Sequence, residues 1–469
     1  MDQRIASAVA SLRALATRNR CHSLDLTIVQ GGRVSPMRRR PPKLAESTWL
    51  DLRLRIHRTV LLPPFLSWAM CELIGRAIEQ AIQRRRLLGG AGASALAAVL
   101  GKPASAAEVA QQEARIAQAK SAAAGFGTRL LLLGTAGGPT YWPNTNRRST
   151  SSALVVGDAV YLVDCGDGVG KRLQEALDPP DQRATMKALR AIFLTHLHSD
   201  HVIDYPNILL YGWFAGIESA ASPLRVFGPG RRGEMEPVFT PPGRQAVEPQ
   251  VMNPSNPTPG TADMTDYLYQ AFATDINDRM RDNGNKDLRI LVKVEDIKLP
   301  EIAGFKSPNE TPEPEMQPFK IYEDDRVRVS ATLVYHAPIW PAFGYRFDTD
   351  EGAVVFSGDT APSENLVRLA KGADILVHEV IVTPWIDRLL PPPRNPAQEA
   401  LRAHLLSAHT PVEKVGKVAE SAGVSTLVLN HIVPGNARAE ELVPAQQDFG
   451  GQLVIGEDLL QLGVRRARH

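Results

Sequence analysis

The fold of this chain is decided by the stretch Thr195-His196-Leu197-His198-Ser199-Asp200-His201, which directly follows the apolar run 191–194. Three histidines and one aspartate fall within six positions here, although the whole chain has only 11 histidines in 469 residues. Imidazole and carboxylate groups are ligands for Zn²⁺ and similar divalent ions. His196 and His198 point the same way on an extended chain, whereas Asp200 and His201 come after the turn. The spacing predicts two neighbouring ions, and the alternative is a histidine-rich surface loop.

Three further apolar runs end in a potential ligand. The run 333–335 ends at His336, the run 354–358 ends at Asp359, and the run 427–430 ends at His431. Each residue alone is more often a structural polar group at the end of a strand. Ligands at strand ends can, however, converge on one edge of a pair of sheets. Together with the cluster they give five histidines and two aspartates, which suits two ions that share a carboxylate.

This set of motifs resembles the metallo-β-lactamase superfamily over about residues 127–460. The resemblance implies an α/β fold, an αββα four-layer sandwich with a binuclear metal site at its edge. It implies that one ion is held by His196, His198 and His336 and a second ion by Asp200, His201 and His431. It also implies that Asp359, together with a water or hydroxide, bridges the two ions. Asp164, in the turn 164–168, matches the supporting aspartate of the family. The alternative for Asp164 is an ordinary turn carboxylate.

Within the superfamily, the chain resembles the branch that contains ribonuclease Z and zinc-dependent arylsulfatases. The matching phrases are Leu133-Gly134-Thr135, Phe356-Ser357-Gly358-Asp359-Thr360, His378-Glu379 and His409-Thr410. The resemblance makes Asp200, Glu379 and His409 the catalytic residues, with Glu379 orienting His409 and His409 protonating the leaving group. The alternative for Glu379 is an ordinary glutamate at the end of a strand, and the alternative for His409 is a histidine that caps a helix.

The preferred function is a binuclear metal-dependent hydrolase that cleaves aryl sulfate esters by attack of a metal-bridging hydroxide. Resemblance of the stretches 134–139, 198–201 and 429–434 to sulfatase-like members favours a small-molecule anionic ester as substrate. The alternative function is a phosphodiesterase or a ribonuclease Z-like endoribonuclease acting on tRNA. A third and less favoured function is that of a non-catalytic metal-binding protein. Two Zn²⁺ ions are the expected cofactors, with Mn²⁺ or Fe as alternatives. Arg147 and Arg148 are candidates for binding the substrate anion or are a solvated pair.

The N-terminal part differs in charge from the remainder. Residues 1–120 hold 19 Lys and Arg against 8 Asp and Glu, whereas the remainder holds 34 against 43. An acidic catalytic part disfavours nucleic acid as a partner. Residues 84–107 combine three arginines, a short Gly- and Ala-rich apolar segment and Ala104-Ser105-Ala106, which resembles a twin-arginine export signal. Its position predicts that residues 1–83 are a non-native or disordered basic extension, with Met70 as one later start.

The expected location is therefore the periplasm or the exterior of the cell, and the alternative location is the cytoplasm. The alternative for residues 84–107 is an Ala-rich helix of a real N-terminal domain. The apolar segment is too short for a membrane span. Oligomeric state is open, with a homodimer as one arrangement. Cys165 is the one cysteine near the site and is expected to be a buried, unreactive residue rather than a nucleophile.

The remaining chain predicts a linker or helix at 108–126 and a hydrolase domain at 127–469 with an insertion at about 240–320. Strands are expected at 129–133, 152–156, 160–163, 191–195, 224–227, 327–335, 343–347, 353–357, 375–377 and 426–429. Helices are expected at 170–177, after the histidine cluster, at 262–281 within the insertion, at 363–369 and at 411–422.

Overall fold

The computed structural model describes residues 106–466, except 239, 241–244 and 246. The predicted extension 1–83 and nearly all of the predicted export segment 84–107 lie outside the described residues. The described part begins with helix α4 (Ala106–Ala123), which covers most of the segment expected to be a linker or helix. Within the described residues, no helix combines the length and the apolar character that a membrane span requires.

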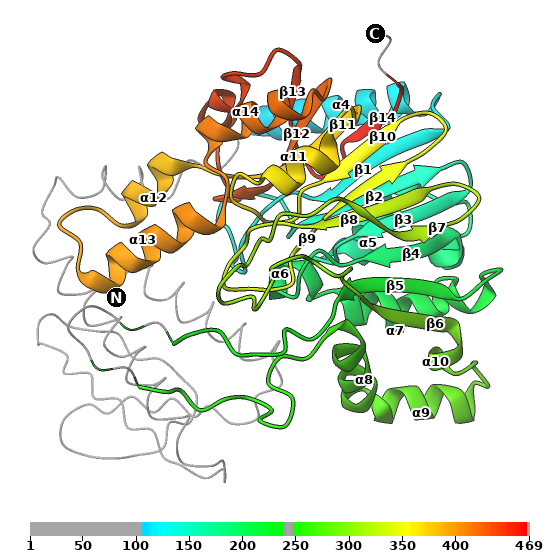
Figure 1. The fold of residues 1–469 in the computed structure, drawn as a ribbon. Coiled ribbons are helices and arrows are strands. Elements are labelled where there is room, and N and C mark those ends of the chain that lie inside the picture. The colour runs from blue at the N-terminus through cyan, green and yellow to red at the C-terminus, as the bar shows by residue number, and fades with distance from the viewer. Residues whose placement is uncertain (1–105, 239, 241–244, 246, 467–469) are drawn as a thin grey trace, which may run out of the picture. The chain divides into compact units, whose positions relative to one another are not determined.

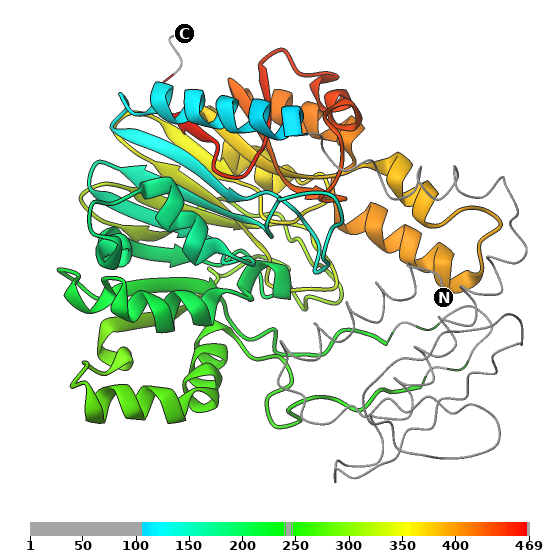
Figure 2. The ribbon, with the colours of Figure 1, turned by 180° about the vertical axis from the view of Figure 1, so that it is seen from behind.

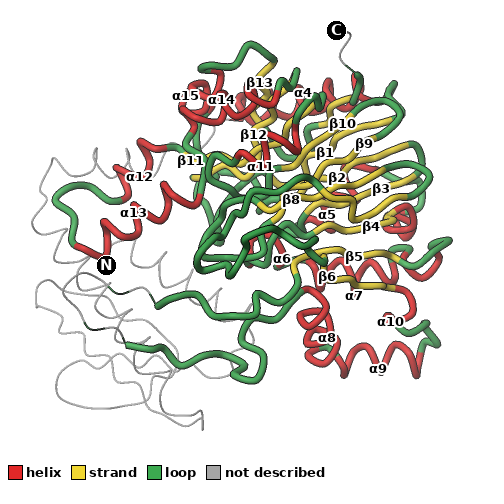
Figure 3. The backbone as a smooth tube through the Cα atoms, in the orientation of Figure 1, coloured by secondary structure: helices red, strands yellow, loops and turns green. Residues whose placement is uncertain are grey.

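Two seven-stranded mixed sheets form the centre of the domain (Figure 1, Figure 3). The first sheet has the order β14 (Gln461–Gly463), β1 (Thr128–Gly134), β2 (Ser151–Val156), β3 (Ala159–Val163), β4 (Leu189–Phe193), β5 (Leu224–Pro229) and β6 (Val292–Ile297). The second sheet has the order β13 (Gln452–Ile455), β12 (Thr426–Val433), β11 (Ile375–Ile381), β10 (Ala353–Phe356), β9 (Phe343–Asp348), β8 (Arg328–Leu333) and β7 (Phe319–Glu323). In each sheet, antiparallel pairs at one side give way to parallel pairs at the other.

The central strands are apolar at nearly every position because both of their faces are buried. Leu130 and Leu132 of β1 belong to the core between the sheets, whereas the alternate residues Leu131 and Leu133 belong to the core beneath the outer helices. Phe193 of β4 lies in the inner core, where several aromatic rings from both sheets meet. Because side chains alternate between the two faces of a strand, the same strands supply both layers of the core.

Helices cover the outer face of each sheet (Figure 1, Figure 2). The helices α5 (Val169–Leu177) and α7 (Tyr205–Phe214) pack on the first sheet. The helices α11 (Glu364–Ala370) and α14 (Val412–Ala422) pack on the second sheet. The predicted αββα four-layer sandwich is confirmed, and most of the predicted strands and helices lie within a few residues of their expected bounds.

The segment 240–320 differs from the prediction of an insertion with a single helix. It contains α8 (Thr261–Ala271), α9 (Ala273–Asp282) and α10 (Leu288–Leu291), and the expected helix 262–281 is interrupted at Phe272. Its strand β6 pairs in parallel with β5 over six residues and forms the edge of the first sheet. Part of this segment therefore completes the sandwich instead of lying outside it.

Two helices that the sequence did not predict project from the second sheet as a hairpin beside the strand ends (Figure 1). They are α12 (Thr383–Leu389) and α13 (Pro396–Ala408). Asn395 caps α13, because its side chain accepts a hydrogen bond from the backbone N–H of Gln398. The short helices α6 (Ser199–Val202) and α15 (Ala439–Leu442) and the 3₁₀ turns Gln182–Ala188, Ile217–Ser219 and Val443–Gln446 complete the described elements.

Candidate active site

The histidine cluster lies at the carboxyl end of β4, where the chain leaves the sheet. β4 pairs in parallel with β3 and β5, so its end lies at the edge where parallel strands commonly present functional groups. Thr195 and His196 continue from the strand, and the chain then turns into α6, which carries Asp200 and His201 in its first turn. One strand and one short helix therefore present all four potential ligands from a single turn.

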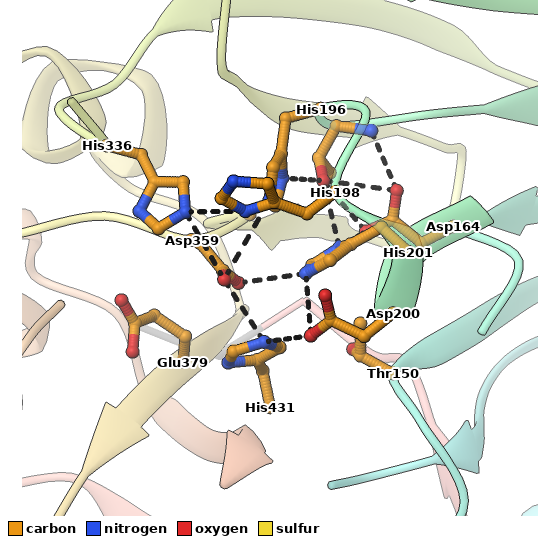
Figure 4. A network of polar contacts seen from close by, with 12 residues as sticks. Thr150, Asp164, His196, His198, Asp200, His201, His336, Asp359, Glu379 and His431 are labelled. Carbon is orange, nitrogen blue, oxygen red and sulfur yellow. Dashed lines mark hydrogen bonds and ion pairs between the residues drawn. The ribbon is translucent and has the colours of Figure 1, made fainter. Parts of the chain in front are cut away.

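The second sheet supplies the other three groups at the same edge. His336 follows β8, Asp359 follows β10 and His431 lies within β12. His431 has a φ of +41°, in the left-handed region that non-glycine residues rarely adopt. The pairing of β11 with β12 shifts register next to this position. The unusual backbone at His431 thus turns its side chain toward the facing sheet, where Figure 4 shows it close to Asp200 and Asp359.

Three imidazoles form the first group. The Nδ1 atom of His198 lies 3.0 Å from Nε2 of His196 and 3.2 Å from Nε2 of His336. The ring of His336 is held by its other nitrogen, because Nδ1 donates a hydrogen bond of 2.8 Å to the carbonyl of Ala408. This bond leaves Nε2 of His336 without a proton and free to act as an electron-pair donor.

A second group contains two imidazoles and a carboxylate. Oδ2 of Asp200 lies 3.2 Å from Nε2 of His431 and 3.8 Å from Nε2 of His201. Asp359 lies between the two groups, with Oδ1 at 3.3 Å from Nε2 of His201 and Oδ2 at 3.7 Å from Nε2 of His336. The structure therefore brings all seven predicted ligands together, and Asp359 lies between the two groups (Figure 4).

The donor set fits metal ions. Nε2 of His201 and Oδ1 of Asp359 are buried and have no hydrogen-bond partner among the described residues. Buried polar atoms without partners are costly unless something else satisfies them. Both atoms face the other predicted ligands, within the distances that a shared cation needs. Imidazole nitrogens and carboxylate oxygens in this number are the donors that Zn²⁺ and related ions prefer.

The electrostatics of the site also favour a cation. Burial lowers the pKa of His196 well below its usual value and lowers the pKa of His336 to about 3, which keeps both rings neutral. Burial acts in the same direction on His201, but the carboxylates of Asp359 and Asp164 outweigh it and raise its pKa. The carboxylates around His201 therefore stabilise positive charge at the centre of the site.

Asp164 lies directly behind the ligands. Its Oδ2 is 2.8 Å from Nδ1 of His201, and its Oδ1 accepts a hydrogen bond of 2.7 Å from the backbone N–H of Thr195. The hydroxyl of Thr195 also donates to Asp164. A carboxylate in this position orients the imidazole, so that Nε2 faces the ligand cluster. Sequence reasoning selected Asp164 but missed Thr195, which precedes the cluster and carries no distinctive signal of its own.

Glu379 and His409 form a pair beside the two ligand groups. Glu379 lies in β11, and His409 follows the last residue of α13. Oε1 of Glu379 lies 3.1 Å from Nδ1 of His409 and also accepts backbone N–H groups from Thr360 and Thr410. Burial lowers the pKa of His409, but the Glu379 carboxylate more than compensates and raises it to about 9. His409 is thereby held in an orientation in which Nε2 lies on the side of the ring away from Glu379.

A glycine-containing loop closes the other side of the site, and sequence reasoning did not assign it a role. The backbone N–H of Gly138 donates a hydrogen bond of 2.8 Å to Oδ2 of Asp200. Gly137 packs against His431 so closely that a Cβ atom at this position would lie 2.4 Å from the imidazole. The consecutive glycines were the available signal, because paired glycines often mark a close approach of backbone to a functional group.

The two arginines that were candidates for anion binding have other partners. The Arg147 guanidinium donates hydrogen bonds to the carbonyls of Gly435, Ala437 and Gly456. Arg148 forms an ion pair of 3.1 Å with Asp167 at the surface. These contacts favour a structural role for Arg147 and a solvated surface position for Arg148.

Cys165 is fully buried, as expected, and burial raises the pKa of its thiol, so it is not a nucleophile of the site.

Comparison with known proteins identifies the family of this chain. The family profile described as "Metallo-beta-lactamase superfamily" matches residues 145–262. A ribonuclease Z of Mycobacterium marinum is 29% identical over 338 residues, which cover 71% of this chain and 98% of that protein. A ribonuclease Z of Mycolicibacterium paratuberculosis is 30% identical over 336 residues, which cover 71% of this chain and 97% of that protein. Among solved structures, the short form of human tRNase Z is 16% identical with a TM-score of 0.43, covering 72% of this chain and 99% of that one. The chain therefore belongs to the metallo-β-lactamase superfamily and, within it, to the branch that contains ribonuclease Z.

Proposed function

We propose that this protein is a binuclear metal-dependent phosphodiesterase that cleaves RNA. The observation that carries the proposal is its relation to ribonuclease Z over nearly the full length of those relatives, at 30% identity over 336 residues. The site supports a hydrolase, because it combines a set of metal-binding donors with a separate Glu–His pair. The acidic balance of residues 121–469 gives no support to an RNA substrate, so the proposal rests on the relatives and the site.

The two ligand groups would hold two ions. One ion would be held by His196, His198 and His336, the other by Asp200, His201 and His431, and Asp359 would contact both. Two bound divalent ions would lower the pKa of a water molecule and neutralise charge on the phosphate. Zn²⁺ is the expected ion, and Mn²⁺ is compatible with the same donors.

The residues of the chain supply the remaining chemistry. His409 lies next to both groups, with its ring centre 5.0 Å from that of His336 and 5.9 Å from that of His431. Its Nε2–H can donate a proton to the departing oxygen of the ester, while Glu379 stabilises the charged ring and fixes its orientation. Asp164 and Ala408 hold His201 and His336 in the tautomers that leave their Nε2 atoms facing the site.

This proposal reverses the preference for aryl sulfate esters. The sequence motifs favoured a sulfatase with a small-molecule anionic ester as substrate, whereas the relatives over most of the described domain are ribonucleases. Sulfate monoesters and phosphodiesters both carry one negative charge and non-bridging oxygens around the reacting atom. The ligand groups alone therefore do not discriminate between the two substrates, and the difference comes from the parts of the domain that surround them.

The test is a direct comparison of substrates with the purified, Zn²⁺-loaded protein. The substrates are a tRNA with a 3′ extension, bis(p-nitrophenyl) phosphate and p-nitrophenyl sulfate. We expect cleavage of the RNA and of the phosphodiester, and we expect both activities to be lost in Asp359→Asn. Turnover of the aryl sulfate without any cleavage of phosphodiesters would refute the proposal and restore the sulfatase interpretation.

We also propose export of the protein by a twin-arginine-type route, on the basis of residues 84–107. The arginine run and the Ala104-Ser105-Ala106 pattern support it. N-terminal sequencing of the protein recovered from outside the cytoplasm should give a mature start at Ala107. A start well upstream of that residue, or recovery only from the cytoplasm, would exclude export through this signal.

A further inference from the structure

Asp458 is a buried carboxylate that the proposed reaction does not use. It follows β13 near the end of the described chain, and it is 7% exposed. Its Oδ1 accepts a hydrogen bond of 2.8 Å from the hydroxyl of Thr135, and its Oδ2 accepts one of 2.8 Å from the backbone N–H of Arg148. Thr135 and Arg148 lie on opposite sides of one loop. The carboxylate therefore joins the two ends of that loop to the C-terminal part of the domain.

We call residues 135–142, the first part of the loop between Thr135 and Arg148, the rim loop. Its first residues pair with β12 next to His431, because the N–H of Ile432 donates to the carbonyl of Thr135 and the N–H of Gly137 donates to the carbonyl of Ile432. The N–H of Ala136 donates to the carbonyl of Arg148, at 2.9 Å. The Thr135 backbone thus pairs beside a proposed ligand, while its side chain is held by Asp458.

The rim loop contacts two proposed ligands of the second ion. Gly138 donates its N–H to Oδ2 of Asp200, and the same oxygen lies 3.2 Å from Nε2 of His431. Gly137 has no room for a Cβ atom because the His431 ring lies against it. A displacement of the loop by a few tenths of an ångström would therefore move both side chains.

The carboxylate is supported by positive charge from the same region. NH2 of Arg172 lies 3.8 Å from Oδ2 of Asp458. Arg147 attaches the chain after the rim loop to the segments around Gly435 and Gly456 through backbone carbonyls. A buried carboxylate with two hydrogen-bond donors and a nearby guanidinium is costly to disturb, because any atom left unpaired keeps its full desolvation penalty.

We propose that Asp458 and Thr135 are positioning residues for the second ion: Asp458 fixes the rim loop, and the rim loop fixes Asp200 and His431. This inference rests on the ligand assignment under the proposed function. Neither residue touches the reacting atoms. Among the described residues, the hydrogen-bond partners of Asp458, Thr135 and Gly138 do not include His196, His198 or His336, which meet the second group through Asp359. The first ion should therefore be affected less than the second when Asp458 or Thr135 is changed.

The decisive comparison is Thr135→Val against Thr135→Ser in the full-length protein. Valine keeps the shape of threonine but removes the hydroxyl that donates to Asp458, whereas serine keeps it. Zn²⁺ binding is followed by calorimetry and by metal analysis after dialysis. We expect Thr135→Val to weaken the second equivalent by about 10-fold and the first by less, since partners behind metal ligands commonly contribute that much. Thr135→Ser should bind both equivalents like the wild type.

Two further variants keep the test decisive if Thr135→Val does not fold. Asp458→Asn should weaken the same equivalent, because an amide cannot accept at both positions. Arg148→Ala is the matched control, since it removes an exposed side chain and keeps the backbone N–H that donates to Asp458. In Thr135→Val and Asp458→Asn, kcat should fall with little change in KM, whereas Arg148→Ala should keep the kcat and KM of the wild type.

Several outcomes would overturn the inference. One is an equal loss of both equivalents, and another is a lower melting temperature with unchanged Zn²⁺ affinity, which would indicate a merely structural role. A wild-type protein without a second equivalent would also overturn it. A protein that binds two ions but cleaves no RNA would refute the proposed substrate and would leave the positioning role of Asp458 and Thr135 unaffected.

Discussion

Replacement of His409 by alanine should slow the cleavage of esters with poor leaving groups far more than the cleavage of esters with good ones. Nδ1 of His409 lies 3.1 Å from Oε1 of Glu379, and His409 is the proposed donor of a proton to the departing oxygen. An RNA alkoxide needs that proton, whereas p-nitrophenolate leaves readily without it. The variant should therefore lose activity on RNA and retain much of its activity on bis(p-nitrophenyl) phosphate.

The expected magnitude follows from the role of the residue and from what its removal leaves behind. General acid catalysis contributes about 10²- to 10⁴-fold, which corresponds to about 2.7 to 5.4 kcal/mol in the barrier. Oε1 of Glu379 still accepts the N–H groups of Thr360 and Thr410 after the change, so the buried carboxylate keeps two partners. The loss should therefore appear in kcat and not in the stability of the fold.

The assay is kcat/KM for a series of phosphodiesters that differ in leaving group, together with the metal content of each preparation. His404→Ala is the matched control, since His404 lies on the same helix α13 and is exposed. Equal losses across the leaving-group series would refute the proposed proton donor. A loss of bound Zn²⁺ in His409→Ala would instead show that His409 is a ligand.

Three further predictions concern the same site. Glu379→Gln should lower the pKa of His409, because the carboxylate that stabilises the charged ring is removed. The protonated ring is lost as pH rises through that pKa, so the alkaline limb of the pH–rate profile should move to lower pH. An unmoved alkaline limb would contradict the pairing of Glu379 with His409. Removal of metal with EDTA should lower the melting temperature by several degrees and Zn²⁺ should restore it, because ions that bind only the folded state stabilise it; an Asp359→Asn protein should respond less. Gly137→Ala should cost about 1–3 kcal/mol in the free energy of unfolding, measured by urea denaturation, because the new Cβ overlaps the His431 ring, and an unchanged midpoint would show that the loop adapts freely.

The candidate ligands could be located in the sequence because they follow four apolar runs, each of which forms a buried strand. His336, Asp359 and His431 are far apart in the sequence, yet the ends of buried strands meet at one edge of the sandwich. Local pattern was therefore enough to identify them. The same pattern could not show how His431 is turned toward the site, since that depends on a positive φ within β12.

Other features depend on contacts that no local pattern encodes. Thr135 and Asp458 are 323 residues apart, and each is an ordinary polar residue in its own segment. Helical periodicity predicted one helix at 262–281 but could not locate a break at Phe272, because the apolar positions on both sides contact the same core. β6 alternates between buried and exposed residues at the edge of its sheet, so it lacked the continuous apolar run of the central strands.

Each of the two proposed ion sites takes ligands from both sheets, and this has a consequence for biosynthesis. His198 and His336 are separated by 138 residues, and Asp200 and His431 by 231. A nascent chain presents only the His196–His201 segment until the second sheet has emerged, and His431 comes from one of the last strands to be made. The first site needs β8 of the second sheet, and the second site cannot be completed before nearly the whole domain is synthesised and its two sheets are joined. Loading of both proposed sites would therefore come at the end of folding, and the compartment in which the chain finishes folding would determine which ions are available to it.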